Sequence, residues 1–186
     1  MSVRKIRLLG DPILRTPASR VTSFDGELRR LVKDLSDTLV EAGGAGLAAP
    51  QIGVLLRVFV YVDADPVSPT YQQVRHLVNP VAADTSVETA TEEEGCLSIP
   101  GIFCELARPV RVVANGFSEH EERVAVVGAD RIARCFAHEI DHLDGVVFLD
   151  RLAPDERRRA MREIREMLLN GENVVVKRSP HGGVVG

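Results

Sequence analysis

Residues 131–143 carry the feature that most restricts how this chain can fold. Their apolar residues recur at helical spacing, which predicts an amphipathic helix with Gly145 just past its end. His138 and His142 lie four residues apart, so they project from one face, one turn apart. Two imidazoles at this spacing suit one zinc-like ion, with Glu139 beside it as general base. A solvated histidine pair is the alternative. A metal site would require the rest of the chain to bring a third ligand to this helix.

Several kinds of third ligand can be weighed. A third histidine after the glycine would fall at position 148, which is Phe148, so that pattern fails. A glutamate on a later helix, Glu163 or Glu166, would follow the thermolysin-like pattern. However, little chain remains to build the rest of such an enzyme. A cysteine is the remaining kind of ligand.

The chain has three cysteines, which differ in their surroundings. Cys135 lies on roughly the same helical face as His138 and could line a pocket, but three ligands on one straight helix close poorly around an ion. Cys104 has no polar neighbour that marks it and is expected to be a buried thiol. Cys96 lies in EEEGCLSIP, which we expect to be an exposed loop that presents a ligand rather than a core strand. An inert, packed Cys96 is the alternative.

A glycine-rich segment, GGAGLAAPQ at residues 43–51, superficially fits a dinucleotide-binding fingerprint. That fingerprint needs a strand before it and a helix after it. Here a predicted helix precedes the segment, and Pro50 and a strand follow, so the nucleotide interpretation is rejected. Two interpretations remain. One is a backbone that a ligand can approach closely, with Gln51 as an amide donor, and the other is a tight structural loop.

The other segments predict an α+β fold: antiparallel sheets around the central metal-binding helix, with an N-terminal and a C-terminal helix. Residues 1–170 are expected to form one domain, followed by a flexible tail at 171–186. The C-terminal helix begins at Pro154 and should turn Ala160, Ile164, Met167 and Leu168 inward. The other predicted elements are a helix at 25–42, strands at 56–63 and 75–80, the second ended by Pro80, and an antiparallel pair at 110–115 and 122–128.

Composition excludes some classes of function. A net charge of −4 argues against a general nucleic-acid binder, and no apolar run approaches the roughly 20 residues of a membrane span. The N-terminal apolar segment is too short for a signal peptide. An odd number of cysteines makes a disulfide framework unexpected and favours a reducing cytoplasm.

Three motifs taken together resemble those of the peptide deformylase family. GAGLAAPQ, EGCLS and HEIDH occur in the order and approximate spacing of that family, and the resemblance extends over most of residues 6–152. It implies a cytoplasmic, metal-dependent hydrolase that removes the formyl group from the N-terminal formyl-methionine of new polypeptides and releases formate. It also implies that Cys96 is the third ligand.

The resemblance assigns roles to the motif residues. Cys96, His138 and His142 would hold one divalent metal, natively Fe²⁺ and replaceable by Zn²⁺, Ni²⁺ or Co²⁺, with a fourth position left for water. Glu139 would accept the proton of that water. The residues that would stabilise the oxyanion are Gln51 through its side-chain amide and Leu97 through its backbone N–H. The residues that would contact the substrate are Ala45, Gly46, Glu94, Gly95 and Cys135.

The chain departs from the family pattern at two positions. Ala45 replaces a frequent isoleucine or valine beside the expected substrate path, so side-chain preference is expected to differ. Ala137 replaces a glutamine but points off the ligand face, so activity should remain. The implied partners are formyl-methionyl nascent peptides and the ribosome, the latter through the helix that carries Arg157–Arg159. No membrane and no sequence-specific nucleic acid is expected.

Two other functions use the same metal-ligating residues. The first is a structural metal site without catalysis, but such sites usually have four protein ligands, and Glu139 would then have no purpose. The second is a metallopeptidase of another specificity, which an assay on formylated and free peptides would distinguish.

Overall fold

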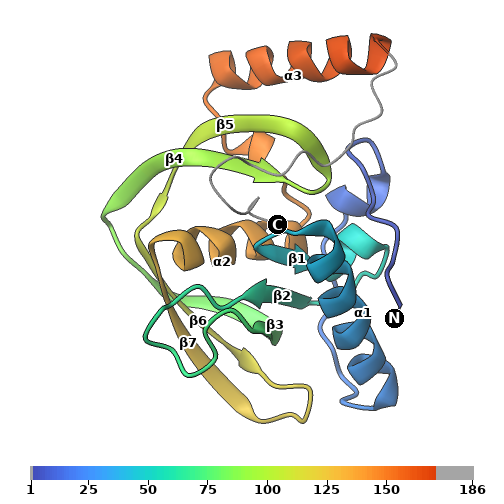
Figure 1. Cartoon of the computed structure of the whole chain (residues 1–186), viewed down its shortest axis with the longest axis vertical. Coiled ribbons are helices and arrows are strands. Elements are labelled where there is room, and N and C mark those ends of the chain that lie inside the picture. Colours follow the sequence, from blue (N-terminus) through green and yellow to red (C-terminus); the bar gives the residue numbers. More distant parts are fainter. Residues whose placement is uncertain (1, 171–186) are drawn as a thin grey trace.

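The computed structural model describes residues 2–170 (Figure 1). Its elements, in chain order, are a 3₁₀ turn at Pro12–Arg15, α1 (Gly26–Ala42), β1 (Gly46–Ala48), a 3₁₀ turn at Ala49–Ile52, β2 (Val58–Val62), β3 (Val74–Thr85), β4 (Thr89–Cys96), β5 (Ile99–Pro109), β6 (Arg111–Phe117), β7 (Arg123–Ala129), α2 (Asp130–Leu143), a 3₁₀ turn at Phe148–Asp150, and α3 (Pro154–Leu169). The predicted tail at 171–186 lies outside the described residues. None of the helices within residues 2–170 has the length and apolar character that a membrane crossing requires.

Helix α2 lies between two antiparallel sheets. The larger sheet has the strand order β1-β2-β3-β6-β7, and β4 and β5 form a separate two-stranded sheet. Figure 1 shows β4 and β5 arching over one side of α2, with the larger sheet on the other side. Helix α1 packs against β1 and β2, and α3 lies outside β5. The predicted α+β arrangement around a central helix is confirmed.

The ends of α1 and α2 lie where the sequence predicted them, and local interactions explain why. The Asp25 carboxylate accepts hydrogen bonds from the first-turn N–H groups of α1, and Gly43 ends that helix in the left-handed conformation, at φ 68°. After α2, Gly145 has φ 74°, and a side chain there would also approach the Arg15 carbonyl oxygen to 2.8 Å. These glycines fix where each helix stops.

The apolar face of α2 packs on the larger sheet. Phe136 is fully buried and meets the Tyr61 ring edge-on, with centroids 4.9 Å apart. This contact orients the helix, so the opposite face, which carries both histidines, turns toward β4 and β5.

The segment around Cys96 corrects one prediction. EEEGCLSIP is not an exposed loop: it forms the end of β4 and the turn into β5, and Cys96 is 1% exposed. The acidic run hid the strand from sequence reasoning, because glutamates are depleted in strands and Glu94 is buried only through ion pairs. Strand β5, which contains the buried Cys104, was not predicted.

The strand predicted to end at Pro80 also needs correction. β3 continues to Thr85, because its pairing with β6 shifts register between Val78 and Val81. Asn79 adopts φ 50° at this bulge, and the irregularity accommodates a proline that a regular ladder would exclude.

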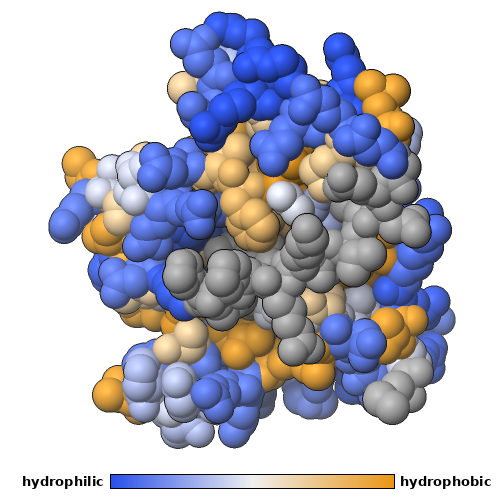
Figure 2. Space-filling model, turned by 45° about the horizontal axis from the view of Figure 1, so that its top comes forward, coloured by the Kyte–Doolittle hydropathy of each residue, from blue (hydrophilic) through white to orange (hydrophobic). Residues whose placement is uncertain are grey.

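The C-terminal helix begins at Pro154 as predicted. Ala160 is buried, and Ile164 and Met167 pack partly against the core beside β5. Leu168 was predicted to point inward but is 67% exposed, because it lies in the last turn of α3, away from the buried Ala160. The outer surface of this helix is mostly hydrophilic (Figure 2).

Candidate metal centre

The structure brings together the three predicted ligands. Cys96 comes from the end of β4, and His138 and His142 come from α2; their donor atoms all lie within 4.8 Å of one another. The Cys96 Sγ is 3.2 Å from the His142 Nε2. Each of the three residues is 1% exposed.

An unsatisfied nitrogen supports metal binding at this cluster. The His138 Nε2 is buried and has no hydrogen-bond partner among the described residues. Burying a polar atom without a partner is costly, and a cation between the three donors would supply the missing partner. Burial also lowers the pKa of His142 well below its usual value, which favours the neutral, ligating form of its imidazole. One thiolate and two imidazoles suit a borderline-soft divalent ion.

Glu94 fixes the orientation of His138. Its Oε1 lies 2.7 Å from the His138 Nδ1, so a proton on Nδ1 leaves Nε2 free to bind a metal. Burial would raise the pKa of Glu94, but the hydrogen bonds with His138 and Arg108 outweigh it and hold the pKa well below its ordinary range. Glu94 is therefore an anion next to the ligand.

Glu139 is placed for proton transfer. Both of its carboxylate oxygens are buried without a partner among the described residues. Burial, with a smaller contribution from Glu94, raises the pKa of Glu139 to about 8, although nearby His138 opposes the shift. A carboxylate that titrates near neutral pH can both accept and return a proton.

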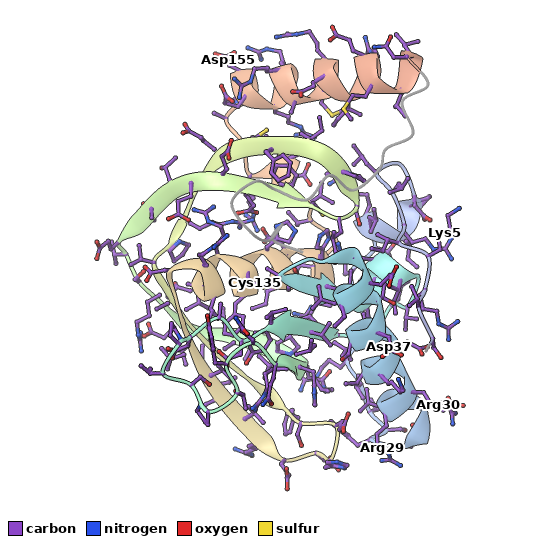
Figure 3. All side chains as sticks on the ribbon, viewed as in Figure 1. Lys5, Arg29, Arg30, Asp37, Cys135 and Asp155 are labelled. Atoms are coloured by element: carbon purple, nitrogen blue, oxygen red, sulfur yellow. The ribbon has the colours of Figure 1, made fainter. Side chains whose placement is uncertain are left out.

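Gly46 keeps the space beside Glu139 open. A Cβ at this position would lie 2.6 Å from the Glu139 Oε1 and 2.7 Å from the Cys135 Sγ. Cys135 therefore lines this part of the site, between α2 and β1 (Figure 3), and its thiol lies 3.7 Å from the Ala45 carbonyl oxygen. Burial and the charge of Glu139 raise the pKa of Cys135 well above its usual value, so its thiol remains protonated.

Gln51 lies at the same site, in the 3₁₀ turn at Ala49–Ile52. Its Oε1 accepts a hydrogen bond from the Ala48 N–H at 2.8 Å, which orients the amide. Its Nε2 donates to the Ser98 Oγ at 3.3 Å and lies 3.7 Å from the Cys96 Sγ. Leu97, whose backbone N–H is the second donor predicted for an oxyanion, lies between Cys96 and Ser98 in the turn from β4 to β5.

The remaining predicted substrate contacts differ in their surroundings. Gly95 is buried, and a Cβ there would lie 2.6 Å from the Phe103 ring. This contact accounts for the glycine by packing alone. Glu94 is 1% exposed, and both of its oxygens are bound to protein side chains. It has no free oxygen for a substrate.

Sequence reasoning missed the buried charges around Glu94. These charged residues are Arg108, Arg134 and Asp141, which are 7%, 3% and 6% exposed. One signal was available, because Arg134 and Asp141 lie four residues before and three residues after His138, on the same helical face. The position of Arg108 on a neighbouring strand could not be read from spacing.

Comparisons with known proteins agree on one family. Residues 3–158 match the family model described as Polypeptide deformylase. The peptide deformylase of Acidothermus cellulolyticus is 58% identical over 97% of this chain and 96% of its own length. The one from Parafrankia sp. is 53% identical over 97% of this chain and 96% of its own length.

Solved structures give the same result. A peptide deformylase from Ehrlichia chaffeensis superposes with a TM-score of 0.83 at 31% identity and covers 91% of this chain and 99% of its own. One from Legionella pneumophila has a TM-score of 0.81 at 36% identity, with 92% and 98% covered.

Proposed function

The chain belongs to the polypeptide deformylase family, and from this premise we propose that its metal centre removes the formyl group from N-terminal formyl-methionine. The reaction is hydrolysis of the formamide bond: water adds to the formyl carbon, formate leaves and the peptide retains a free amine. The observation that carries the proposal is the Glu139 carboxylate, which has no partner within residues 2–170 and directly follows His138 of a buried Cys-His-His cluster.

The ligand set comprises Cys96, His138 and His142. When bound, a divalent metal would lower the pKa of a water molecule and polarise the formyl oxygen. Among the residues that the structure describes, three form the cluster, which favours this catalytic role over a structural one, because structural sites normally have four protein ligands. We assign Fe²⁺ as the native ion on family resemblance, and the donor set also accepts Zn²⁺, Ni²⁺ and Co²⁺.

The chain's own groups would divide the proton and charge transfers between them. Glu139 takes a proton from the attacking water and passes it to the departing amine nitrogen. The Gln51 amide and the Leu97 backbone N–H donate to the formyl oxygen as it becomes negative. Gly46 lets the substrate backbone approach Glu139, since any side chain there would collide with the carboxylate.

Other residues would set substrate preference and context. Ala45, Gly46, Gly95 and Cys135 are proposed to border the substrate, and the small Ala45 side chain leaves room for residues that an isoleucine would exclude. Glu94 is reassigned from the substrate to His138. We propose that residues 1–170 act as one domain in the cytoplasm; the three free cysteines agree with a reducing compartment.

The main test is formate release from formyl-Met-Ala-Ser, with metal content measured on the same sample prepared without oxygen. We expect formate production at about one metal per chain, with iron as the metal. Unformylated Met-Ala-Ser should remain intact. Peptide-bond cleavage of that control would indicate a metallopeptidase instead, and metal binding without formate release would indicate a structural site.

Gln51→Ala should lower kcat by about 10²–10³-fold with little change in KM, because its hydrogen bond strengthens as the oxyanion forms. Gln51→Met keeps the side-chain volume and should show the same loss. Steady-state kinetics on the formylated tripeptide measure both. A change confined to KM would make Gln51 a substrate-positioning residue.

The ribosome is proposed as a partner through α3. Its arginines line a groove of about 510 Å³, and their charge suits a polyanion such as ribosomal RNA. The arginines that line it are Arg157, Arg158, Arg162 and Arg165. The simpler alternative is a solvated helix with local ion pairs, and Arg158–Asp155 and Arg159–Glu156 are such pairs.

Reversing charge in this groove should separate the two interpretations. Arg162→Glu with Arg165→Glu should abolish most ribosome co-sedimentation at low salt and leave turnover of the tripeptide unchanged. The matched control is Arg29→Glu with Arg30→Glu, which makes the same charge change on α1, at the opposite side of the molecule from α3 (Figure 3). Equal co-sedimentation of both double variants would leave α3 with a structural role only.

A further inference from the structure

We propose that Arg108 and Arg134 are positioning residues of the metal centre, which hold Glu94 in place so that Glu94 can orient His138. The proposal rests on the proposed function, because it requires the Cys-His-His cluster to bind a metal. It gives a role to Arg108 and Arg134, two buried side chains that take no part in the proton transfer or in the stabilisation of the oxyanion.

Glu94 has every oxygen in use. Arg108 binds the Glu94 carboxylate through two hydrogen bonds, from Nε to Oε2 at 3.0 Å and from Nη2 to Oε1 at 2.7 Å. Arg134 donates from Nη1 to Oε2 at 3.0 Å, and the fourth contact is the His138 Nδ1. A carboxylate offers about four lone-pair sites, so these contacts saturate it and leave it one orientation.

Arg134 also ties the helix to the hairpin that carries the cysteine ligand. It stands one turn before His138 on α2, and its guanidinium donates to the Leu106 carbonyl oxygen at 2.8 Å and the Ala90 carbonyl oxygen at 2.9 Å. These acceptors lie on β5 and β4. One rigid guanidinium thus fixes α2, with two ligands, against the sheet that ends in Cys96.

Arg108 makes the reciprocal connection from the sheet to the helix. It projects from β5, and its Nη1 donates to Asp141 Oδ2 at 2.8 Å. Asp141 directly precedes His142 and is held from the other side by Arg151. Arg108 therefore bridges the residue that orients His138 and the neighbour of His142.

The loss of either arginine should act on the metal through Glu94. Removing either arginine takes away contacts that fix the Glu94 carboxylate, so the carboxylate can turn within its buried site. The His138 Nδ1 then loses its fixed acceptor, and Nε2 is no longer aimed at the other two donors. Groups that hold a ligating histidine in this way typically contribute about 10–100-fold to metal affinity.

The test measures Co²⁺ affinity by chelator competition and the visible spectrum of the Co²⁺ protein. Arg108→Gln and Arg134→Gln should each weaken Co²⁺ binding about 10–100-fold and alter the thiolate–cobalt bands. Arg134→Lys should recover part of the affinity, because one ammonium donor can still reach Glu94, whereas Arg108→Lys should not replace a two-bond grip. Arg111→Gln is the matched control: Arg111 also lies on a strand and pairs with Asp84 at the surface.

A double variant shows whether the arginines affect Co²⁺ affinity through Glu94. Glu94→Gln combined with Arg108→Gln should bind Co²⁺ no more weakly than Glu94→Gln alone, since the Glu94 carboxylate through which Arg108 is proposed to act on His138 is then already lost. Unchanged affinity and spectrum in both glutamine variants, with only a lower Tm of the metal-free protein, would overturn the proposal. Additive losses in the double variant would also overturn it.

The lysine variants and Glu94→Gln provide a test that does not depend on the folding of the arginine-to-glutamine variants. If the glutamine variants do not fold, Arg134→Lys, Arg108→Lys and Glu94→Gln decide, because all three retain side-chain volume. A difference in Co²⁺ spectrum between the two lysine variants supports the proposal, and wild-type spectra in both overturn it. Failure of the wild-type protein to bind metal or release formate would instead remove the proposed function itself.

Discussion

Glu139→Gln is expected to bind metal normally and to lose about 10²–10⁴-fold in kcat, the contribution that a positioned general base usually makes. The amide has the size of the carboxylate, so it fits the same buried space, but it cannot accept the proton of the attacking water. The three metal donors belong to other residues, which is why occupancy should not fall. Formate release and metal content on one sample measure both effects.

The matched control is Glu93→Gln. Glu93 is also a glutamate of the metal-site region, three residues before Cys96, but it is exposed and on the outer side of β4. Its replacement makes the same change of charge and should leave kcat unaltered. Turnover of Glu139→Gln within about tenfold of wild type would exclude the proton shuttle, since a general base contributes more than that.

The buried state of Glu139 adds a second expectation for the same variant. An ionisable group that is buried without a partner destabilises the fold whenever it is charged. Replacing it by a neutral amide should therefore not lower the Tm of the metal-free protein. A loss of activity together with preserved folding and occupancy would locate the effect in the chemical step.

The helices were predictable from the sequence because their signals are local. Asp25 and Gly43 mark the ends of α1, and the spacing of His138 and His142 follows directly from helix geometry. The pairing of β6 with β7 was predictable for the same reason. Both segments have alternating or apolar residue patterns, and a short connection joins them.

The third ligand could not be settled by residue chemistry alone. Cys96 lies in a strand that carries three consecutive glutamates. The sequence of such a strand is typical of a loop, unless the side chains that pair with the buried glutamate are known. The partners are distant: Arg108 is 14 residues from Glu94, and Arg134 is 40. Local sequence made Cys96 a candidate and left an inert thiol as the alternative, and the resemblance to a family then selected it. The buried arginines around Glu94 became visible only in three dimensions.

Cys96→Ala is expected to abolish both stoichiometric metal binding and formate release. The substitution removes the only thiolate from the donor set and leaves two imidazoles of one helix, which cannot enclose an ion from opposite sides. His138→Ala and His142→Ala should have the same consequence, because each deletes one of three donors. Metal analysis after dialysis against a weak chelator measures occupancy.

Cys104→Ala is the control that isolates ligation from packing. Cys96 and Cys104 lie in the same core cluster, at 1% and 3% exposed, so both alanine variants create a comparable cavity. The two cysteines differ in chemistry. Burial raises the pKa of Cys104, so its thiol stays neutral, and Cys104 does not belong to the cluster that contains the two histidines. Cys104→Ala should therefore lose stability but keep its metal and its activity. If Cys96→Ala instead retained one metal per chain while losing only stability, as Cys104→Ala is expected to do, the sulfur of Cys96 would be a packing group and the site would need another third ligand.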